Sequence, residues 1–302
     1  MYAQYCEEEL WDHAERAFRE SLRLRKMHLG QDSSEVAESM FSLGFVYTSR
    51  NDATNARKHY EGSLRIYKMK LDPADPQLAD NYSSLGSVHH SLGDADKALF
   101  CHNQAIRIFT DVYGKYDEKV ALSLACKGDI LRSNGMFEDS LSCFAECLDI
   151  RKSYEGSMLS KESADVLCQM GLIYSTLKDN ANASSCFASA VTTYKQIFGV
   201  KHPKVADVLH IMSVHFVKVG EFERGYSCVK EALALREEIL GRLSAEAGDS
   251  QYCMGTILFT WNEYDEARKC FEISREAHTY ALGAAHLSVA NSNFYLGCIC
   301  GA

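Results

Sequence analysis

The sequence has little proline, no long apolar run and no secretory leader. Its 302 residues include prolines at positions 73, 76 and 203 alone, which excludes long proline-rich linkers. No stretch of 18 or more apolar residues occurs, so we expect no transmembrane helix. The amino terminus, MYAQYCEEELWDHAERAF, is acidic and polar, whereas a signal peptide is basic and then apolar. These absences predict a cytoplasmic protein.

A surplus of positive charge is also missing. Asp and Glu number 41 against 32 Lys and Arg, which gives a net charge of −9. Nucleic-acid binding needs a basic surface that displaces counterions, and anionic membranes attract basic segments. We therefore expect neither nucleic acid nor a membrane among the partners.

Signatures of catalysis are missing as well. The sequence contains no GxSxG, P-loop, GxGxxG or HExxH motif, and its 11 histidines are scattered. Without a nucleophile–base pair or a phosphate cradle there is no convergent catalytic group. The sequence predicts a protein that is not an enzyme, with no catalytic residues, no cofactor and no metal ligands.

An internal repeat is present along the whole chain. A small residue recurs in steps of 42, 42, 43, 42, 42 and 42 residues. We use these residues as the anchors of the repeat: Gly44, Gly86, Gly128, Gly171, Ser213, Gly255 and Gly297. Steps this regular indicate a repeat architecture, in which each unit packs only on its neighbours.

Further positions keep the same register relative to each anchor. Seven residues later come residues that mostly tolerate left-handed backbone, namely Asn51, Gly93, Gly135, Lys178, Gly220 and Asn262. Twelve residues later every side chain is small: Ala56, Ala98, Ser140, Ala183, Gly225 and Ala267. Sixteen residues later the side chains are mostly large: Tyr60, His102, Phe144, Phe187, Val229 and Phe271. Each unit therefore reads as helix, tight turn, helix, with the helices amphipathic and the fold all-α.

This pattern resembles the tetratricopeptide repeat in its 42-residue form, as in kinesin light chains. Small and large residues of that repeat are matched by Gly44, Tyr47, Ala56, Tyr60 and Ser63, and the connector IFGVKHPKVADVL at residues 197–209 is similar to theirs. The resemblance covers essentially the whole chain. It implies a right-handed α-solenoid of stacked antiparallel helix hairpins.

The repeat also predicts the domain organisation. We expect a single array over residues 1–302, with a partial repeat (the second helix) at 1–30, six full repeats at 31–283 and a partial repeat (the first helix) at 284–302. Neither end has the polar cap that a solenoid normally needs for solubility. We therefore expect a fragment of a larger protein.

Candidate partner-binding residues follow from the resemblance, which implies that the first helix of each hairpin lines a concave groove. Six residues before each anchor lies a column rich in acids: Glu38, Asp80, Leu122, Asp165, Asp207, Asp249 and Asn291. Three residues further on lies a mixed column: Phe41, Ser83, Ala125, Cys168, His210, Tyr252 and Phe294. The candidate groove residues are Glu38, Phe41, Asp80, Asp165, Asp207, His210, Asp249 and Tyr252.

Each column has a structural alternative to partner binding. Acids in the first turn of a helix favourably meet its dipole without any ligand. Mixed apolar and small residues also suit the contact between adjacent first helices. In kinesin light chains an asparagine column clamps a peptide in this groove, whereas here the mixed column contains no asparagine. If the groove binds a partner, a protein or peptide segment of basic character would suit the acidic column.

A cysteine column is the least usual feature. Cys101, Cys143, Cys186, Cys228 and Cys270 lie fifteen residues after successive anchors. Equivalent residues of stacked hairpins are roughly 10 Å apart, which is too far for a disulfide or a shared metal ion. Buried thiols at a helix seam are the favoured interpretation.

Two functions fit these features. The first is a protein–protein interaction scaffold that holds a partner segment in its groove, as a kinesin light chain-like adaptor does. The second is a structural or sensor arm of a larger multidomain signalling protein.

Overall fold

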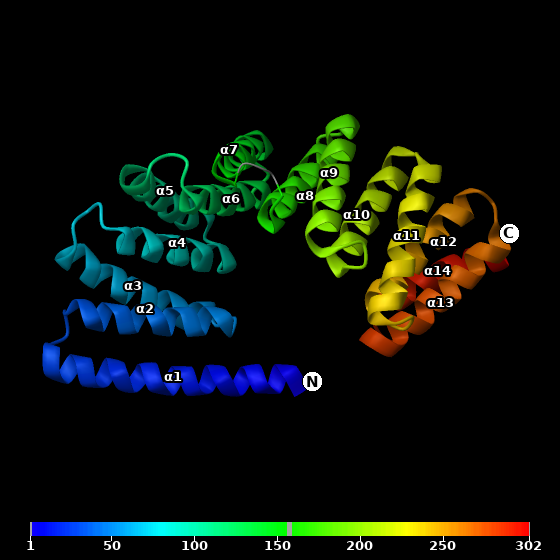
Figure 1. Ribbon diagram of the computed structural model, residues 1–302. Helices are drawn as coiled ribbons and strands as arrows, with labels where there is room; N and C mark the ends of the chain where they lie inside the picture. Colours follow the sequence, from blue (N-terminus) through cyan, green and yellow to red (C-terminus); the bar gives the residue numbers. More distant parts are fainter. Residues whose placement is uncertain (1, 156–158, 302) are drawn as a thin grey trace. The chain divides into compact units, whose positions relative to one another are not determined.

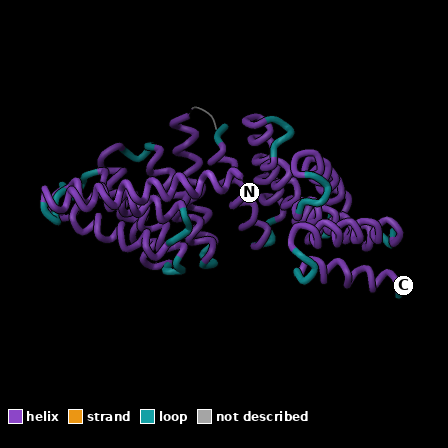
Figure 2. The backbone as a smooth tube through the Cα atoms, turned by 90° about the horizontal axis from the view of Figure 1, so that it is seen from below, coloured by secondary structure: helices purple, strands orange, loops and turns teal. Residues whose placement is uncertain are grey.

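The computed structural model describes the backbone of residues 2–155 and 159–301 and the side chains of residues 10–153 and 159–301. Within these ranges the chain forms helices joined by short loops, and no strand occurs (Figure 2). The all-α fold expected from the sequence is confirmed. None of the described helices is both long and apolar enough to span a membrane.

The helices alternate between the first and second helix of a hairpin. The first helices are α2 (Ser34–Ser49), α4 (Pro76–Ser91), α6 (Glu118–Ser133), α8 (Lys161–Thr176), α10 (Pro203–Val219), α12 (Ala245–Thr260) and α14 (Leu287–Cys300). The second helices are α1 (Tyr2–Leu29), α3 (Ala53–Lys70), α5 (Ala95–Tyr113), α7 (Phe137–Glu155), α9 (Asn180–Phe198), α11 (Phe222–Leu240) and α13 (Tyr264–Leu282). Each first helix from α2 to α12 packs most extensively on the second helix that follows it (Figure 1).

The tight turn inside each hairpin is built as the sequence predicts. Its left-handed residues, all with φ between 58° and 83°, are Asn51, Gly93, Gly135, Lys178, Gly220 and Asn262. Helix starts are also encoded locally, because side chains of Ser33, Asp75 and Asp117 accept hydrogen bonds from backbone N–H groups of the first turn. The turn and cap chemistry thus sets the ends of the helices.

The anchor glycines allow the two helices of a hairpin to approach closely. A Cβ atom built on Gly171 would lie 2.6 Å from the ring of Phe187, and one on Gly128 would lie 2.6 Å from the ring of Phe144. Such distances are too short for any real Cβ contact. The aromatic side chain sixteen residues after the anchor therefore occupies the space that a side chain on the anchor would need.

The fifth anchor shows the same relationship in a different form. Ser213 replaces glycine there, and the smaller Val229 replaces the aromatic residue. The Ser213 hydroxyl donates a hydrogen bond to the carbonyl oxygen of Gly225 across 2.7 Å. A larger residue at the anchor is therefore matched by a smaller one opposite it and by a satisfied buried hydroxyl.

The helices form two compact units, residues 1–157 and 158–302. The first contains α1–α7 and the second α8–α14. Within each unit every second helix also packs on the first helix that follows it, as in α3 with α4 and α11 with α12. Stacking of hairpins is thus observed within each unit. The single array over residues 1–302, with six full repeats between partial ones, stays a prediction.

Candidate functional site

The first helices of the second unit present a hollowed face. A hollow of about 250 Å³ lies between α10 and α12. Its lining residues are His210, Val214, Val217, Lys218, Asp249, Tyr252, Cys253 and Thr256. These residues come from two successive first helices, which is the position that the resemblance implies for a groove.

A second, smaller hollow adjoins the first. It measures about 160 Å³ and is lined by Asp249, Tyr252, His278, Ser288 and Asn291. Asp249 and Tyr252 line both hollows, so the two spaces meet at these side chains. The two hollows therefore adjoin along α12, with α10 on one side and α13 and α14 on the other. We call the two spaces together the α10–α14 groove.

Three predicted groove residues come together there. His210, Asp249 and Tyr252 all line the larger hollow. Burial lowers the pKa of His210 to about 4, so its imidazole is neutral at pH 7. Tyr252 packs edge-on against Phe271 and Tyr295, with ring centroids 5.6 and 5.7 Å away. These contacts fix the Tyr252 ring as a wall of the hollow.

The other predicted residues do not line the α10–α14 groove. Glu38, Phe41 and Asp80 belong to the first unit, and Phe41 packs edge-on against Tyr60 with ring centroids 5.3 Å apart. Asp165 and Asp207 lie in the second unit, but neither lines the two hollows. The candidate set is therefore split between one hollowed face and several separate positions.

The acids six residues before the anchors, which we call the ladder acids, are held by internal partners. Lys119 binds Asp80 across 2.8 Å, and Arg25 binds Glu38 across 2.9 Å. In the second unit the pairs are Asp165 with Lys161 (3.3 Å) and Lys204 (3.8 Å), Asp207 with Arg236 (3.1 Å), and Asp249 with His278 (3.0 Å). Tyr194 also donates a hydrogen bond to Asp165.

These pairs correct the helix-dipole explanation of the acidic column. Each column residue is the fifth residue of its helix, as Glu38 is in α2 and Asp249 is in α12. The fifth residue lies in the second turn, whereas the dipole effect falls off within the first. Specific side-chain partners, and not the helix end, account for these acids.

Most of those partners were not singled out from the sequence. Three of them, Tyr194, Arg236 and His278, belong to a column twenty-three residues after the anchor. The other members of this column are Tyr67, Phe109 and Arg151. Arg236 and His278 are almost fully buried, at 6% and 1% exposed. The column varies between aromatic and basic residues, so no single residue type marks it. Lys218 and Val217, which line the larger hollow, were missed as well.

The cysteine column lies at least partly inside the helix packing. Cys101, Cys143 and Cys270 are buried, and Cys186 and Cys228 are half-buried. Burial raises the pKa of Cys101 and of Cys270 to about 11, so both thiols are protonated at neutral pH. All cysteines whose side chains are described (residues 10–153 and 159–301) are free, and no group of three His, Cys, Asp or Glu side chains in these ranges could hold a metal ion.

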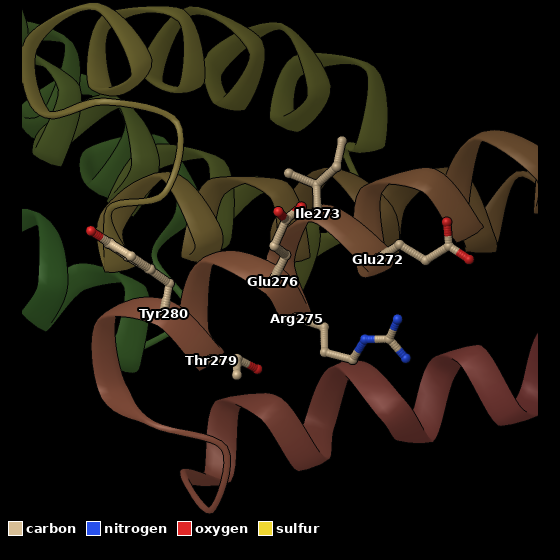
Figure 3. Close-up of a pocket in the computed structure, with 6 residues that line it drawn as sticks. All are labelled: Glu272, Ile273, Arg275, Glu276, Thr279 and Tyr280. Atoms are coloured by element: carbon tan, nitrogen blue, oxygen red, sulfur yellow. The ribbon is translucent and has the colours of Figure 1, made fainter.

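A further depression lies on α13, away from the first-helix face. Figure 3 shows its lining residues, Glu272, Ile273, Arg275, Glu276, Thr279 and Tyr280, which all come from this helix. No helix other than α13 contributes a lining residue to it. Recognition sites enclose a ligand between elements, so this one-sided surface is a weaker candidate than the α10–α14 groove.

Comparisons with known proteins agree with this architecture. Residues 35–111 and 163–204 match the tetratricopeptide repeat family. No curated protein matches the sequence. A putative kinesin light chain from Podospora anserina with nearly identical repeats is similar in structure, with 13% identity and a TM-score of 0.59 over 68% of this chain and 97% of that one.

Two further solved structures share the fold. A signal transduction ATPase with numerous domains and a tetratricopeptide repeat sensor, from Pyrococcus horikoshii, has 14% identity and a TM-score of 0.71 over 93% of this chain and 40% of that one. Aspartyl phosphate phosphatase F from Bacillus subtilis has 9% identity and a TM-score of 0.63 over 93% and 73%. The chain is identified as a tetratricopeptide repeat protein by the family match, the register of its small and large residues and the stacking of its hairpins.

Proposed function

We propose that this protein is an interaction scaffold that binds a segment of a partner protein in the α10–α14 groove. The observation that carries the proposal is the pair of adjoining hollows on the first-helix face, which share Asp249 and Tyr252. Preformed hollows of this kind hold the side chains of a bound segment at little ordering cost. Binding, and not catalysis, is the role that these surfaces support.

The finer role is that of an adaptor similar to kinesin light chains, in the cytoplasm. The 42-residue period and the fold likeness to the putative kinesin light chain support it. The mixed column carries His210 and Tyr252 where that family carries asparagine. We therefore propose a partner segment that is held by side-chain pockets and charge more than by amide clamps on its backbone.

Affinity capture followed by cross-linking tests the proposal. The chain is immobilised, bound proteins are recovered from an extract of the source cells, and the complexes are treated with a lysine- and acid-reactive cross-linker. We expect partner peptides linked to Lys218 and Asp249, identified by mass spectrometry. Partner links confined to the outer face of α13, for instance at Glu272 and Glu276, would rule out the groove as the binding surface.

A second function is favoured by one comparison. The chain matches the ATPase that carries a tetratricopeptide repeat sensor over 93% of its own length, with a TM-score of 0.71. In this alternative the repeats are a structural or sensor arm of a larger signalling protein. A P-loop domain encoded in the same reading frame would support the arm, and a heptad coiled coil would support the adaptor.

A further inference from the structure

The chemistry of the α10–α14 groove indicates which kind of segment it recognises. We propose that it takes an extended peptide in which a Lys or Arg binds Asp249, an adjacent bulky apolar side chain fills the hollow between α10 and α12, and an acidic residue reaches Lys218. This inference rests on the proposed scaffold function and adds the sequence pattern of the partner.

Asp249 differs from the other ladder acids because its ion-pair partner is a histidine. Within the described ranges Glu38, Asp80, Asp165 and Asp207 each pair with a Lys or Arg, which carries a full positive charge at neutral pH. The partner of Asp249 is His278, which is charged only when it is protonated. The Asp249 side chain is also 55% exposed, so a second donor can reach it from the groove.

Among the described residues no Lys or Arg forms an ion pair with Asp249. His210 is neutral at pH 7, because burial lowers its pKa to about 4. The one permanent cation among the lining residues is Lys218, which has no ion pair among the described residues. A cationic side chain of a ligand is therefore the complement that Asp249 lacks.

The centre of the larger hollow is apolar. Val214, Val217 and Tyr252 contribute side chains to it, together with Cys253 and Thr256. Its volume of about 250 Å³ is below the range of about 300–1,000 Å³ that is typical of drug-sized ligands. A space of this size suits a single aliphatic or aromatic side chain, which would gain free energy by leaving water.

The two charges of the hollow come from different helices. Lys218 lies on α10 and Asp249 lies on α12, and both line the larger hollow. We therefore place the apolar residue of the ligand between its cation and its acid.

A peptide library tests the pattern. Random twelve-residue peptides displayed on phage are selected on the immobilised full chain, and the most enriched sequence is synthesised with a fluorescent label. We expect enriched sequences to carry Lys or Arg close to Leu, Ile, Phe or Met, with Asp or Glu on the other side. Enrichment of sequences without this pattern, or of none at all, overturns the inference.

Fluorescence anisotropy then locates the contact. Asp249→Asn removes the charge but keeps an oxygen that accepts from His278, so we expect the fold to be retained and the Kd to rise at least tenfold. Replacing the peptide cation by Met should cause a similar loss on the original chain and little further loss on Asp249→Asn, as a double-mutant cycle requires for a direct contact. Additive losses overturn the inference.

Two matched controls accompany the cycle. Asp165→Asn removes an equivalent ladder charge outside both hollows, and Glu276→Gln removes an acid from the depression on α13 (Figure 3). Both should leave the Kd within twofold. Thr256→Arg should abolish binding, because it fills the hollow and repels the cation. A peptide that binds but is insensitive to Asp249→Asn and Thr256→Arg overturns this inference, whereas the affinity capture above decides the scaffold function separately.

Discussion

Arg236 on α11 donates a hydrogen bond to Asp207 on α10 across 3.1 Å. The same guanidinium donates to the carbonyl oxygen of Glu246 (2.9 Å) and to the hydroxyl of Ser250 (2.8 Å), both on α12. One buried cation thus joins three helices from two successive hairpins. In the first unit Arg25 makes the same two contacts to the following first helix, with the carbonyl oxygen of Glu35 and the hydroxyl of Ser39, but its acidic partner Glu38 also lies on that helix. These ladder acids therefore stabilise the stack of hairpins.

We expect Asp207→Lys to destabilise the second unit. The substitution leaves Arg236 buried without its anionic partner and adds a second positive charge beside it. We expect a loss of about 2 kcal/mol or more in the free energy of unfolding, measured by urea denaturation followed by circular dichroism. Asp207→Asn is the control, since its amide oxygen can still accept from Arg236, and it should cost less. Equal losses for the two variants would show that the charge of Asp207 does not matter.

The anchor glycines give a second prediction. Gly171→Ala places a Cβ atom 2.6 Å from the ring of Phe187, so we expect a loss of about 1–3 kcal/mol in stability from overpacking. Gly297→Ala is the matched variant, because in the described part of the chain no side chain and no backbone of another helix lies within 4 Å of its added Cβ. Alanine there should gain up to about 1 kcal/mol from helix propensity. The same sign for both substitutions in thermal unfolding would contradict the packing argument.

We expect the free energy of unfolding to decrease as the pH is lowered, because of His102. Its ring is fully buried, neither ring nitrogen has a hydrogen-bond partner in the described part of the chain, and burial lowers its pKa to about 4. The unfolded chain, in which a histidine has a pKa of about 6.5, binds the proton more readily. The stability of the folded chain with neutral His102 is therefore fully present above about pH 6.5. As the pH falls from 6.5 towards 4, proton binding by the unfolded chain lowers the free energy of unfolding by about 3 kcal/mol in total.

His102→Phe tests this contribution. Phenylalanine occupies the equivalent position in other hairpins, as at Phe144 and Phe187, so the ring should fit. We expect greater stability than the original chain at pH 7 and a weaker loss between pH 7 and pH 4.5, measured by urea denaturation at each pH. The loss of stability caused by His210 at low pH should remain in the variant, because burial also lowers the pKa of His210 to about 4. If the variant loses as much stability between pH 7 and pH 4.5 as the original chain, His102 is not the cause of the pH dependence.

We expect exposed cysteines to be alkylated much faster than buried ones. Burial raises the pKa of Cys101 and Cys270 to about 11 and that of Cys168 to about 12, whereas Cys298 and Cys300 are exposed. Thiolates are the reactive form, so we expect iodoacetamide at pH 7.5 to label Cys298 and Cys300 first. Peptide mass spectrometry over a time course measures the order. Early labelling of Cys101 or Cys270 in the folded chain would show that these hairpins open readily.

Part of the candidate site could be expected from the repeat. His210, Asp249 and Tyr252, from the columns six and three residues before the anchor, line the larger hollow, whereas Asp165 and Asp207 line neither hollow. The sequence did not distinguish Asp249 from Asp207, because both occupy the same column. Their difference depends on the residue twenty-nine positions later, which is His278 for one and Arg236 for the other.

The sequence by itself determined the register of the hairpins, the left-handed turns and the pairing of small anchors with large side chains. These features depend on residues within one hairpin, so local spacing is sufficient to encode them. Only the tertiary structure decided that the helices form two compact units, that Asp249 has no Lys or Arg partner in the described part of the chain, and that a hollow opens between α10 and α12. Such properties arise where side chains of successive hairpins meet, and the space left there depends on the combined size and charge of residues about forty positions apart.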